Sequence, residues 1–299
     1  SSISPLTKYG IAFDAPTISF LNEDLLYKGC KAYFVKTLGI DKKDFDRAFK
    51  LALKEQERVK AELKEEGKKI IEHAKETQTP VILIVSRPYH IDPLINHKIP
   101  ETIASFGINV LTEDGLDIDE SLADVQVLTQ WSYPNKMFKA VLWAAKQKDL
   151  KLEVVQINSF GCGPDATTSD EIKSILNAYG KSPTLVKVDE ISSPGSIRLR
   201  IRSMIESMKM KGDFFPKEKP QRTIIKRYEK NDKRAILVPK FGHFYDPMIL
   251  TLLQRSGYDT IALPEPDIDS VETGLRYANQ DICYPATIIV GDIVKAVQS

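Results

Sequence analysis

The sequence predicts an α/β protein with two Rossmann-like or flavodoxin-like units and mostly parallel sheets, the second unit truncated. Two observations support this fold class. Short apolar runs bounded by polar residues, typical of buried parallel strands, alternate with segments of helical periodicity. The alternation stops in a polar stretch that contains two prolines and then resumes. We therefore expect an α/β domain over residues 1–215, a linker at 216–233 and an incomplete second unit at 234–299.

The first eighty residues are predicted to be mainly helical. The run APTISFL at 15–21 is compatible with a short strand, and LLYKGCKAYFVKTLG at 25–39 has a helical pattern. Residues 42–75 repeat apolar side chains every three to four positions, with Lys and Glu on the opposite side. This pattern predicts one long helix with a solvated charged face, to which we assign no function.

Four strands, each followed by a helix, are expected in the rest of the first unit. The strands are TPVILIVS (79–86), INVLT (108–112), LEVVQIN (152–158) and TLVKVD (184–189). The helices are PETIASF (100–106), a stretch that includes MFKAVLWAAK (137–146), EIKSILNAYG (171–180) and SIRLRIRSMIESMKM (196–210). Thr168 and Glu171 form a plausible capping box at the start of the third helix.

The same rhythm is expected in the second unit. RAILVPK (234–240) and DTIALP (259–264) are predicted strands, with helices at 246–256 and 271–277. The apolar run TIIVGDIVKAV (287–297) is the candidate third strand. A sheet that ends there would leave an uncovered edge, which predicts that the chain is an excised fragment.

Composition excludes several classes of function. The chain has 299 residues with 42 basic against 41 acidic side chains, so no nucleic-acid partner is expected. No apolar run approaches the roughly 18 residues that cross a bilayer, so no membrane span is expected. Three cysteines do not make a disulfide framework, and the first residues lack a signal peptide. These features predict a cytoplasmic protein.

Three segments carry residues suited to chemistry. SRPYHIDPLINH (86–97) and SFGCGPDA (159–166) each follow a predicted strand. Open α/β sheets bind their ligands at the carboxyl ends of strands, so these two segments are expected at a ligand site. The third, NQDICYPA (279–286), lies in a loop before the last apolar run.

The glycine-rich segment allows two interpretations. Gly161, Gly163 and Ala166 match the dinucleotide fingerprint G-x-G-x-x-A after a strand. Against nucleotide binding, Pro164 removes a backbone N–H from the loop. The capping box also places the start of the helix at about Thr168, too late for the glycines to hold a pyrophosphate at its N-terminus.

The cysteines differ in their surroundings. Cys162 lies between two glycines, so its sulfur can be approached closely, as a nucleophile or a metal ligand requires. Cys283 precedes a Tyr-Pro pair in a loop, a position compatible with an iron–sulfur ligand. Each of these two is also compatible with a small buried hydrophobic residue. Cys30 lies in a helical context and is interpreted as structural.

The RPYHIDPLINH segment is interpreted as a ligand-binding loop. Its two histidines, His90 and His97, do not match a standard metal-site spacing. His90 and Asn96 are expected to hydrogen-bond loop backbone or a ligand, and Arg87 to pair with a carboxylate or a phosphate. The alternative is a stiffened turn in which Tyr89 is packed inside. No Ser-His-Asp set and no P-loop motif are recognised.

Several separate motifs together resemble one family. RPYHIDPLINHKIPE, LTED, QWSY, LEVVQINSFGCGPDATTSDEI, KVDE and IRLRIRS are similar to segments of the large activase-related proteins of the 2-hydroxyacyl-CoA dehydratase system, the CoA-substrate-specific enzyme activases. ANQDICYPATIIVGDI resembles the later cysteine motif of that family. The resemblance runs from about residue 80 to residue 299, and more loosely before that.

The resemblance implies a piece of a longer chain, from anaerobic bacteria, with ASKHA-type ATPase modules upstream. It implies an iron–sulfur cluster, [4Fe-4S] or double-cubane, with Cys162 and Cys283 as candidate ligands. Gly161 and Gly163 would let the cluster approach the backbone, and Arg87, Tyr89, His90 and Asn96 would line the neighbouring cleft. Two cysteines do not fill the ligand sites of a cubane, so the fragment alone is expected to lack a complete cluster.

The function implied is low-potential electron transfer within an ATP-dependent reductase or activase, with an acyl-CoA dehydratase or a small molecule as acceptor. The fragment alone is expected to be inactive. Two alternatives from other classes remain: a binding module for CoA or a nucleotide, and a non-redox scaffold that docks the ATPase modules.

Overall fold

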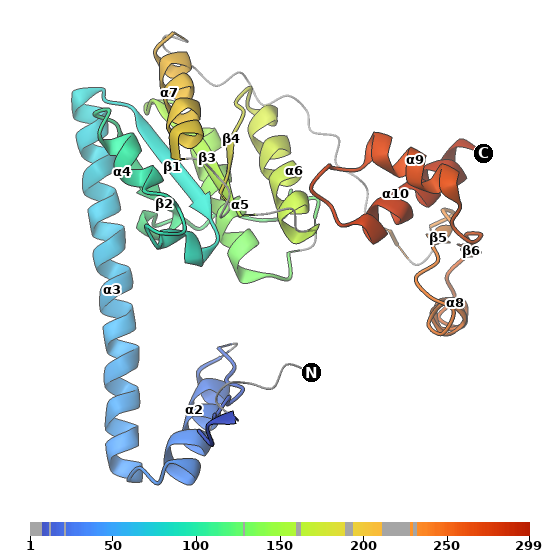
Figure 1. The fold of residues 1–299 in the computed structure, drawn as a ribbon, viewed down its shortest axis with the longest axis horizontal. Coiled ribbons are helices and arrows are strands. Elements are labelled where there is room, and N and C mark those ends of the chain that lie inside the picture. Colours follow the sequence, from blue (N-terminus) through green and yellow to red (C-terminus); the bar gives the residue numbers. More distant parts are fainter. Residues whose placement is uncertain are drawn as a thin grey trace. The chain divides into compact units, whose positions relative to one another are not determined.

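The computed structural model describes residues 8–11, 13–20, 22–127, 129–159, 163–188, 194–210, 228–229 and 232–299. The chain divides into two compact units, Ser1–Leu63 and Lys64–Ser299, each described here by itself. A four-stranded parallel sheet and a two-stranded parallel sheet, surrounded by helices, confirm the predicted α/β class (Figure 1). No helix within the described residues is both long and apolar enough to cross a bilayer.

The first unit is helical around a small group of aromatic rings. Helix α2 (Glu23–Lys31) begins where the Asn22 side chain accepts a hydrogen bond from the Leu25 N–H at 2.9 Å. It continues into a π-helical turn (Ala32–Thr37), and α3 (Lys42–Thr77) starts in this unit. The strand expected at 15–21 is wrong for the described residues 15–20, which are irregular. Pro16 lacks the N–H that a ladder requires. The rings in contact are Tyr27, Phe34, Phe45 and Phe49.

The larger sheet has the strand order β2-β1-β3-β4. All three pairings are parallel, and Ser86 at the end of β1 lies opposite Ile157 of β3. The chain therefore reverses its direction of progress across the sheet between β1 and β3, which is the position where doubly wound folds bind ligands. The strands are β1 (Val81–Ser86), β2 (Asn109–Thr112), β3 (Leu152–Asn158) and β4 (Thr184–Lys187).

Two apolar clusters cover the two faces of this sheet. Val81, Leu83 and Val85 of β1 belong to one cluster, whereas Ile82 and Ile84 belong to the other. This alternation is the two-residue period of a strand buried on both sides, and it explains why the run is apolar throughout. Helices α5 (Ser132–Lys146) and α6 (Gly163–Ala178) contribute to the first cluster, and α4 (Ile99–Ala104) and α7 (Pro194–Met210) to the second (Figure 1).

Helix α6 begins earlier than the sequence suggested. Its first residue is Gly163, so the start predicted at Thr168 is wrong. Thr168 lies inside the helix and its hydroxyl donates to the Pro164 carbonyl at 2.7 Å. The Glu171 carboxylate instead accepts the Gln126 N–H at 3.1 Å. Pro164 is well suited to a first helical turn, where no N–H partner is needed.

The segment 232–299 contains the smaller sheet and three helices. The expected third strand is wrong, because residues 287–297 lie within a helix that starts with Pro285 in its first turn. Its buried positions Thr287 and Gly291 are four residues apart, as helix packing requires. The elements are β5 (Ile236–Val238), α8 (Asp246–Arg255), β6 (Thr260–Ala262), α9 (Ile268–Tyr277) and α10 (Tyr284–Gln298).

Helices α9 and α10 cross at glycines. A Cβ atom on Gly274 would lie 2.0 Å from the Thr287 carbonyl oxygen, and one on Gly291 would lie 1.8 Å from the Ser270 carbonyl oxygen. Both distances are far below van der Waals contact. The two helices therefore approach as closely as they do because neither position carries a side chain.

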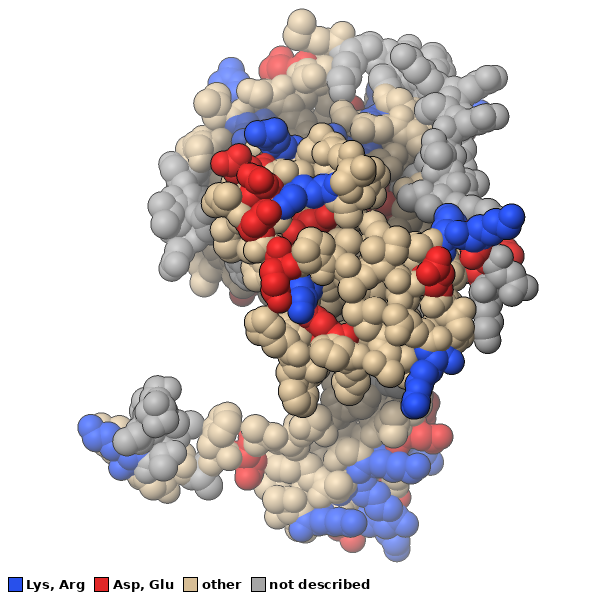
Figure 2. Space-filling view, turned by 90° about the vertical axis from the view of Figure 1, so that its right-hand side faces the viewer, with Lys and Arg blue, Asp and Glu red and all other residues tan. Residues whose placement is uncertain are grey.

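Basic and acidic side chains are interspersed on the face shown in Figure 2, and most of the described atoms there belong to neither kind. That distribution agrees with a formal net charge of +1 for the whole chain. The predicted linker at 216–233 falls mostly outside the described residues and stays a prediction.

Candidate functional site

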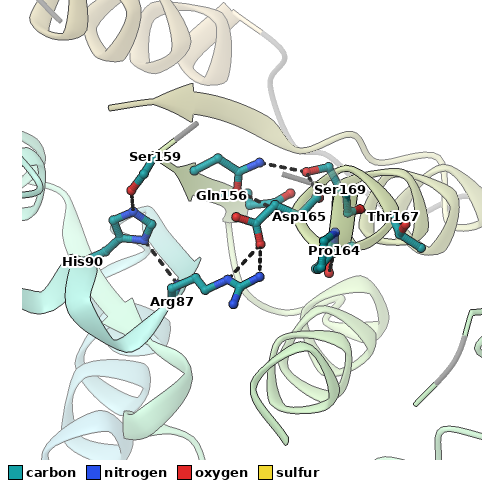
Figure 3. Close-up of polar contacts among 11 residues, drawn as sticks. Arg87, His90, Gln156, Ser159, Pro164, Asp165, Thr167 and Ser169 are labelled. Atoms are coloured by element: carbon teal, nitrogen blue, oxygen red, sulfur yellow. Dashed lines mark hydrogen bonds and ion pairs between the residues drawn. The ribbon is translucent and has the colours of Figure 1, made fainter. Parts of the chain in front are cut away.

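The candidate site lies at the carboxyl ends of β1 and β3. The segment after β1 turns at once into a short 3₁₀ helix, Pro88–Ile91, and the segment after β3 leads to the start of α6. Figure 3 shows Arg87 and His90 from the first segment facing Ser159 and Asp165 from the second. Residues more than 60 positions apart in sequence thus meet at the reversal point of the sheet.

Arg87 is paired with a carboxylate of the same chain. Its Nε and Nη2 atoms donate to Oδ1 of Asp165 at 2.8 and 2.5 Å. The Asp165 residue is 4% exposed and lies in the first turn of α6, where a negative charge is favoured by the helix dipole. The pair connects the end of β1 to the start of α6. Asp165 occupies the helix N-terminus, where a phosphate of a bound nucleotide would have to lie.

His90 is held as a neutral hydrogen-bond donor. Its Nδ1 atom accepts the Arg87 N–H at 3.2 Å, and its Nε2 atom lies 2.6 Å from the Ser159 hydroxyl oxygen. Because Nδ1 is the acceptor, Nε2 carries the proton and donates to Ser159. Burial lowers the pKa of His90 to about 4, with the Asp165 charge opposing and the Arg87 charge assisting this shift. His90 is therefore not placed to take a proton from Ser159, which argues against a hydrolytic Ser-His pair.

Asn96 shapes the loop around His90. Its side-chain amide donates to the His90 carbonyl and its side-chain oxygen accepts the Lys98 N–H, both at 2.8 Å. Lys98 has φ 58°, a left-handed conformation that a non-glycine residue seldom adopts. Asn96 stabilises this turn and is itself buried. Tyr89, the alternative buried residue of the turn, is instead 41% exposed, with its ring 4.4 Å from that of His90.

Glu113 is a site residue that sequence reasoning missed. It follows β2, the neighbour of β1, and its Oε1 atom lies 3.4 Å from the Ser86 N–H. Burial raises the pKa of Glu113 to about 7, against weaker opposing effects from backbone hydrogen bonds. A carboxyl group that titrates near neutral pH can hold or release a proton at this edge of the sheet. The signal available in the sequence was its place directly after a predicted strand.

Ser159 and Asp165 were also missed as individual side chains. Asp165 is fixed further through α6, because the Ser169 hydroxyl donates to its carbonyl at 2.8 Å. The Asn158 side chain donates to the same hydroxyl at 3.0 Å. Polar side chains at the end of β3 thus bind the first turns of the helix that follows.

Cys283 reaches this region from a distant part of the sequence. It is exposed and occupies the N-cap of α10. An ideal Cβ on Gly163 would have the Cys283 Sγ atom as its nearest neighbour, at 3.9 Å. Gly161 and Cys162 lie outside the described residues. A side chain at Gly163, the residue that follows Cys162, would therefore contact the Cys283 sulfur.

The donor set fits an iron–sulfur cluster in part. Within the described residues, no group of three or more His, Cys, Asp or Glu side chains is placed to hold a metal ion. Cys162 and Cys283 together would provide two thiolates, and a cubane takes about four ligands. The described residues do not supply the remaining ligands as a group around one position.

Breaking the Arg87–Asp165 pair is expected to destabilise the larger unit. In Arg87→Ala the Asp165 carboxylate stays buried without its main partner, which costs about 3 kcal/mol. Urea unfolding followed by circular dichroism measures the change. The control is Arg47→Ala, whose partner Asp44 is exposed, with an expected loss below about 1 kcal/mol. Equal losses in the two variants would contradict a structural role for the buried pair.

Comparison with known proteins identifies part of the chain. Residues 2–116 match a family model described as the CoA enzyme activase uncharacterised domain. The matched range includes the whole RPYHIDPLINH segment and Glu113. A search of curated proteins and a search of solved structures returned no match.

Proposed function

We propose, from the premise that residues 2–116 are a CoA enzyme activase-related domain, that this chain is the electron-carrying part of an ATP-dependent activase or reductase. The observation that carries the proposal is that the Cys283 sulfur lies 3.9 Å from the position that a Cβ atom would take on Gly163. Gly163 directly follows Cys162 in the sequence, so this approach supports a common site for the two cysteine motifs.

In this proposal Cys162 and Cys283 would hold an iron–sulfur cluster. Such a cluster, when bound, supplies one-electron chemistry whose potential depends on the hydrogen bonds and charges around its sulfurs. Gly161 and Gly163, which have no side chains, would leave room beside the thiolates. Gly163 is the first residue of α6, and Cys283 is the N-cap of α10. Both cysteines would therefore lie at helix N-termini, which favour the negative charge of thiolates.

The other residues of the site have supporting roles. The Arg87–Asp165 pair fixes the start of α6 relative to β1. Neutral His90 donates to Ser159, whose hydroxyl proton is then directed away from the ring. Asn96 fixes the loop that carries His90, and Tyr89 presents an exposed ring beside it. The ATPase modules and the electron acceptor, an acyl-CoA dehydratase or a small molecule, are proposed partners.

The proposal is tested by anaerobic iron and sulfide analysis, with an absorption spectrum, of the full-length protein beside this chain. We expect bound iron in the full-length protein and its loss in Cys162→Ser and in Cys283→Ser. Cys30→Ser is the matched control and should retain iron, because Cys30 lies in α2 of the unit Ser1–Leu63, away in sequence from both cysteine motifs. A colourless full-length protein prepared strictly without oxygen would contradict the cluster.

A second candidate function, binding of CoA or a nucleotide, is favoured by one observation. Helix α6 starts at Gly163, so the G-x-G-x-x-A pattern does lead directly from β3 into a helix. The buried Asp165 carboxylate in the first turn opposes an anion there. Calorimetry with CoA and NAD decides between the two: affinity that is unchanged by Cys162→Ser and Cys283→Ser would support the binding module.

A further inference from the structure

Residues 232–299 share no large apolar core with the four-stranded sheet. The two apolar clusters of the sheet and its helices draw all their members from residues 70–208. Within the described residues, none from 232–299 belongs to either cluster. Hydrophobic burial normally holds two parts of a domain together. It is therefore not the main contribution to the contact between residues 232–299 and the part of the chain that carries the four-stranded sheet.

The contacts that join the two parts are polar. Lys187, at the end of β4, donates to the Asp281 carboxylate at 2.5 Å. The Asn279 side-chain amide donates to the Asp170 carboxylate of α6 at 2.7 Å. Side chains of the first pair are 46% and 19% exposed. Both contacts involve the loop that leads into α10.

The loop itself is shaped by the same residues. The Asn279 side-chain oxygen accepts the Asp281 N–H at 2.8 Å, and the Asn279 carbonyl accepts the Ile282 N–H at 3.1 Å. One asparagine thus folds the turn and anchors it to α6. Two residues after Asp281 comes Cys283, with its sulfur beside Gly163.

We propose that Asn279 and Asp281 are positioning residues which, with Asp170 and Lys187, form a polar latch that sets the place of Cys283. The latch docks residues 232–299 on the carboxyl end of β4 and the middle of α6. Partly exposed ion pairs contribute little free energy and are screened by salt. The docking is therefore reversible, and Cys283 moves away from Gly163 and returns. Any role of this movement of Cys283 in ligand binding rests on the function proposed above. The existence of the latch does not depend on that function.

Disulfide trapping tests the latch without iron. The parent protein is the full chain with Cys30→Ser, Cys162→Ser and Gly163→Cys, so that the new thiol and Cys283 are the two thiols present. The Gly163 Cβ position lies 3.9 Å from the Cys283 sulfur, about 1 Å farther than in a formed disulfide, so a small movement of the loop closes the bond. In a glutathione redox buffer we expect ready formation of this disulfide, at a rate that falls as NaCl is raised.

Variants of the latch give the decisive comparison. Asp281→Ala and Asn279→Ala should each slow trapping by about fivefold. Asp281→Ala removes the ion pair to Lys187 and should lose much of the salt dependence, whereas Asn279→Ala removes the contact to Asp170 and the side-chain hydrogen bond within the loop. The charge-exchanged pair Lys187→Asp with Asp281→Lys should restore much of the rate. Lys295→Ala breaks an ion pair to Asp267 within residues 232–299 and should leave the rate unchanged. Circular dichroism of each variant shows whether it is folded.

Equal trapping rates in the parent, Asp281→Ala and Asn279→Ala would overturn the latch, and so would the absence of a disulfide in the folded parent. Because Cys162 is replaced throughout, these outcomes do not depend on a cluster. An iron-free full-length protein with a working latch would overturn the proposed function alone. If the full-length protein binds iron but trapping is equally fast in the parent, Asp281→Ala and Asn279→Ala, the latch alone would be overturned.

Discussion

Gly291→Ala is expected to disrupt the α9–α10 hairpin and to destabilise the protein by about 3 kcal/mol. The added methyl group would lie 1.8 Å from the Ser270 carbonyl oxygen and 2.9 Å from the Gly274 nitrogen. Both atoms are helix backbone, so no flexible side chain can move aside. The helices must separate, and the close packing of the buried Ser270 and Thr287 between them is lost. Urea unfolding followed by circular dichroism gives the change in stability.

The control for this substitution is Gly29→Ala in α2. It adds the same methyl group to a helix, but its nearest neighbours are atoms of Ile18 at 3.8–3.9 Å, an ordinary contact. Alanine is the better helix former, so Gly29→Ala should be neutral or stabilising by about 0.5–1 kcal/mol. An unchanged unfolding midpoint in Gly291→Ala would show that α9 and α10 do not cross at this glycine.

The second large effect concerns pH, because His90 and Glu113 shift stability in opposite directions. The pKa of His90 is lowered to about 4, so its unfolded form binds a proton first as pH falls and stability is lost from about pH 6.5 down through pH 4. The pKa of Glu113 is raised to about 7, so stability is lost as pH rises from about 4.5 through 7. Each shift corresponds to about 3 kcal/mol. Between about pH 4.5 and 6.5 the two slopes nearly cancel.

Removing either group should reveal the slope of the other. In Glu113→Gln, the free energy of unfolding relative to the parent protein should increase by about 3 kcal/mol from pH 4.5 to pH 7. In His90→Gln, the same difference should decrease between pH 4 and 6.5. Urea unfolding at half-unit intervals of pH measures both, with the exposed His73 replaced by Gln as control. Difference curves that stay flat in both variants would contradict these two pKa shifts.

The sequence predicted the four-stranded sheet well because its physical signals were local. A run such as VILIV is apolar on both faces because helices cover both faces of the sheet. Such a run can be recognised from the local sequence, without knowing which strands are its neighbours. The segment TIIVGDIVKAV was misjudged because β-branched residues favour strands in isolation. Its helix is imposed by packing of Thr287 and Gly291 against α9, a tertiary effect that no local pattern contains.

The candidate site also has a part that local sequence predicts and a part that depends on tertiary contacts. The carboxyl ends of the strands could be located from the sequence, so Arg87 and His90 were expected at that edge of the sheet, and the structure has them directly after β1. Their role toward a cofactor stays a prediction. The partners Asp165 and Ser159 could not be foreseen, because their proximity depends on β1 and β3 being neighbours. The start of α6 was misplaced because Thr168 and Glu171 have the spacing of a capping box. In the structure, Thr168 hydrogen-bonds to Pro164 and Glu171 to Gln126 instead.

The contact between Gly163 and Cys283 also has a consequence for biosynthesis. The two residues are about 120 positions apart, so at roughly 5–20 residues per second the ribosome delivers the second some 6–24 seconds after the first. The sheet and α6 can therefore form before Cys283 has been synthesised. In the function proposed above, a cluster would take ligands from both segments, so iron supplied during translation would meet an incomplete site. On that proposal, a cluster is expected to be inserted only after synthesis has passed α10.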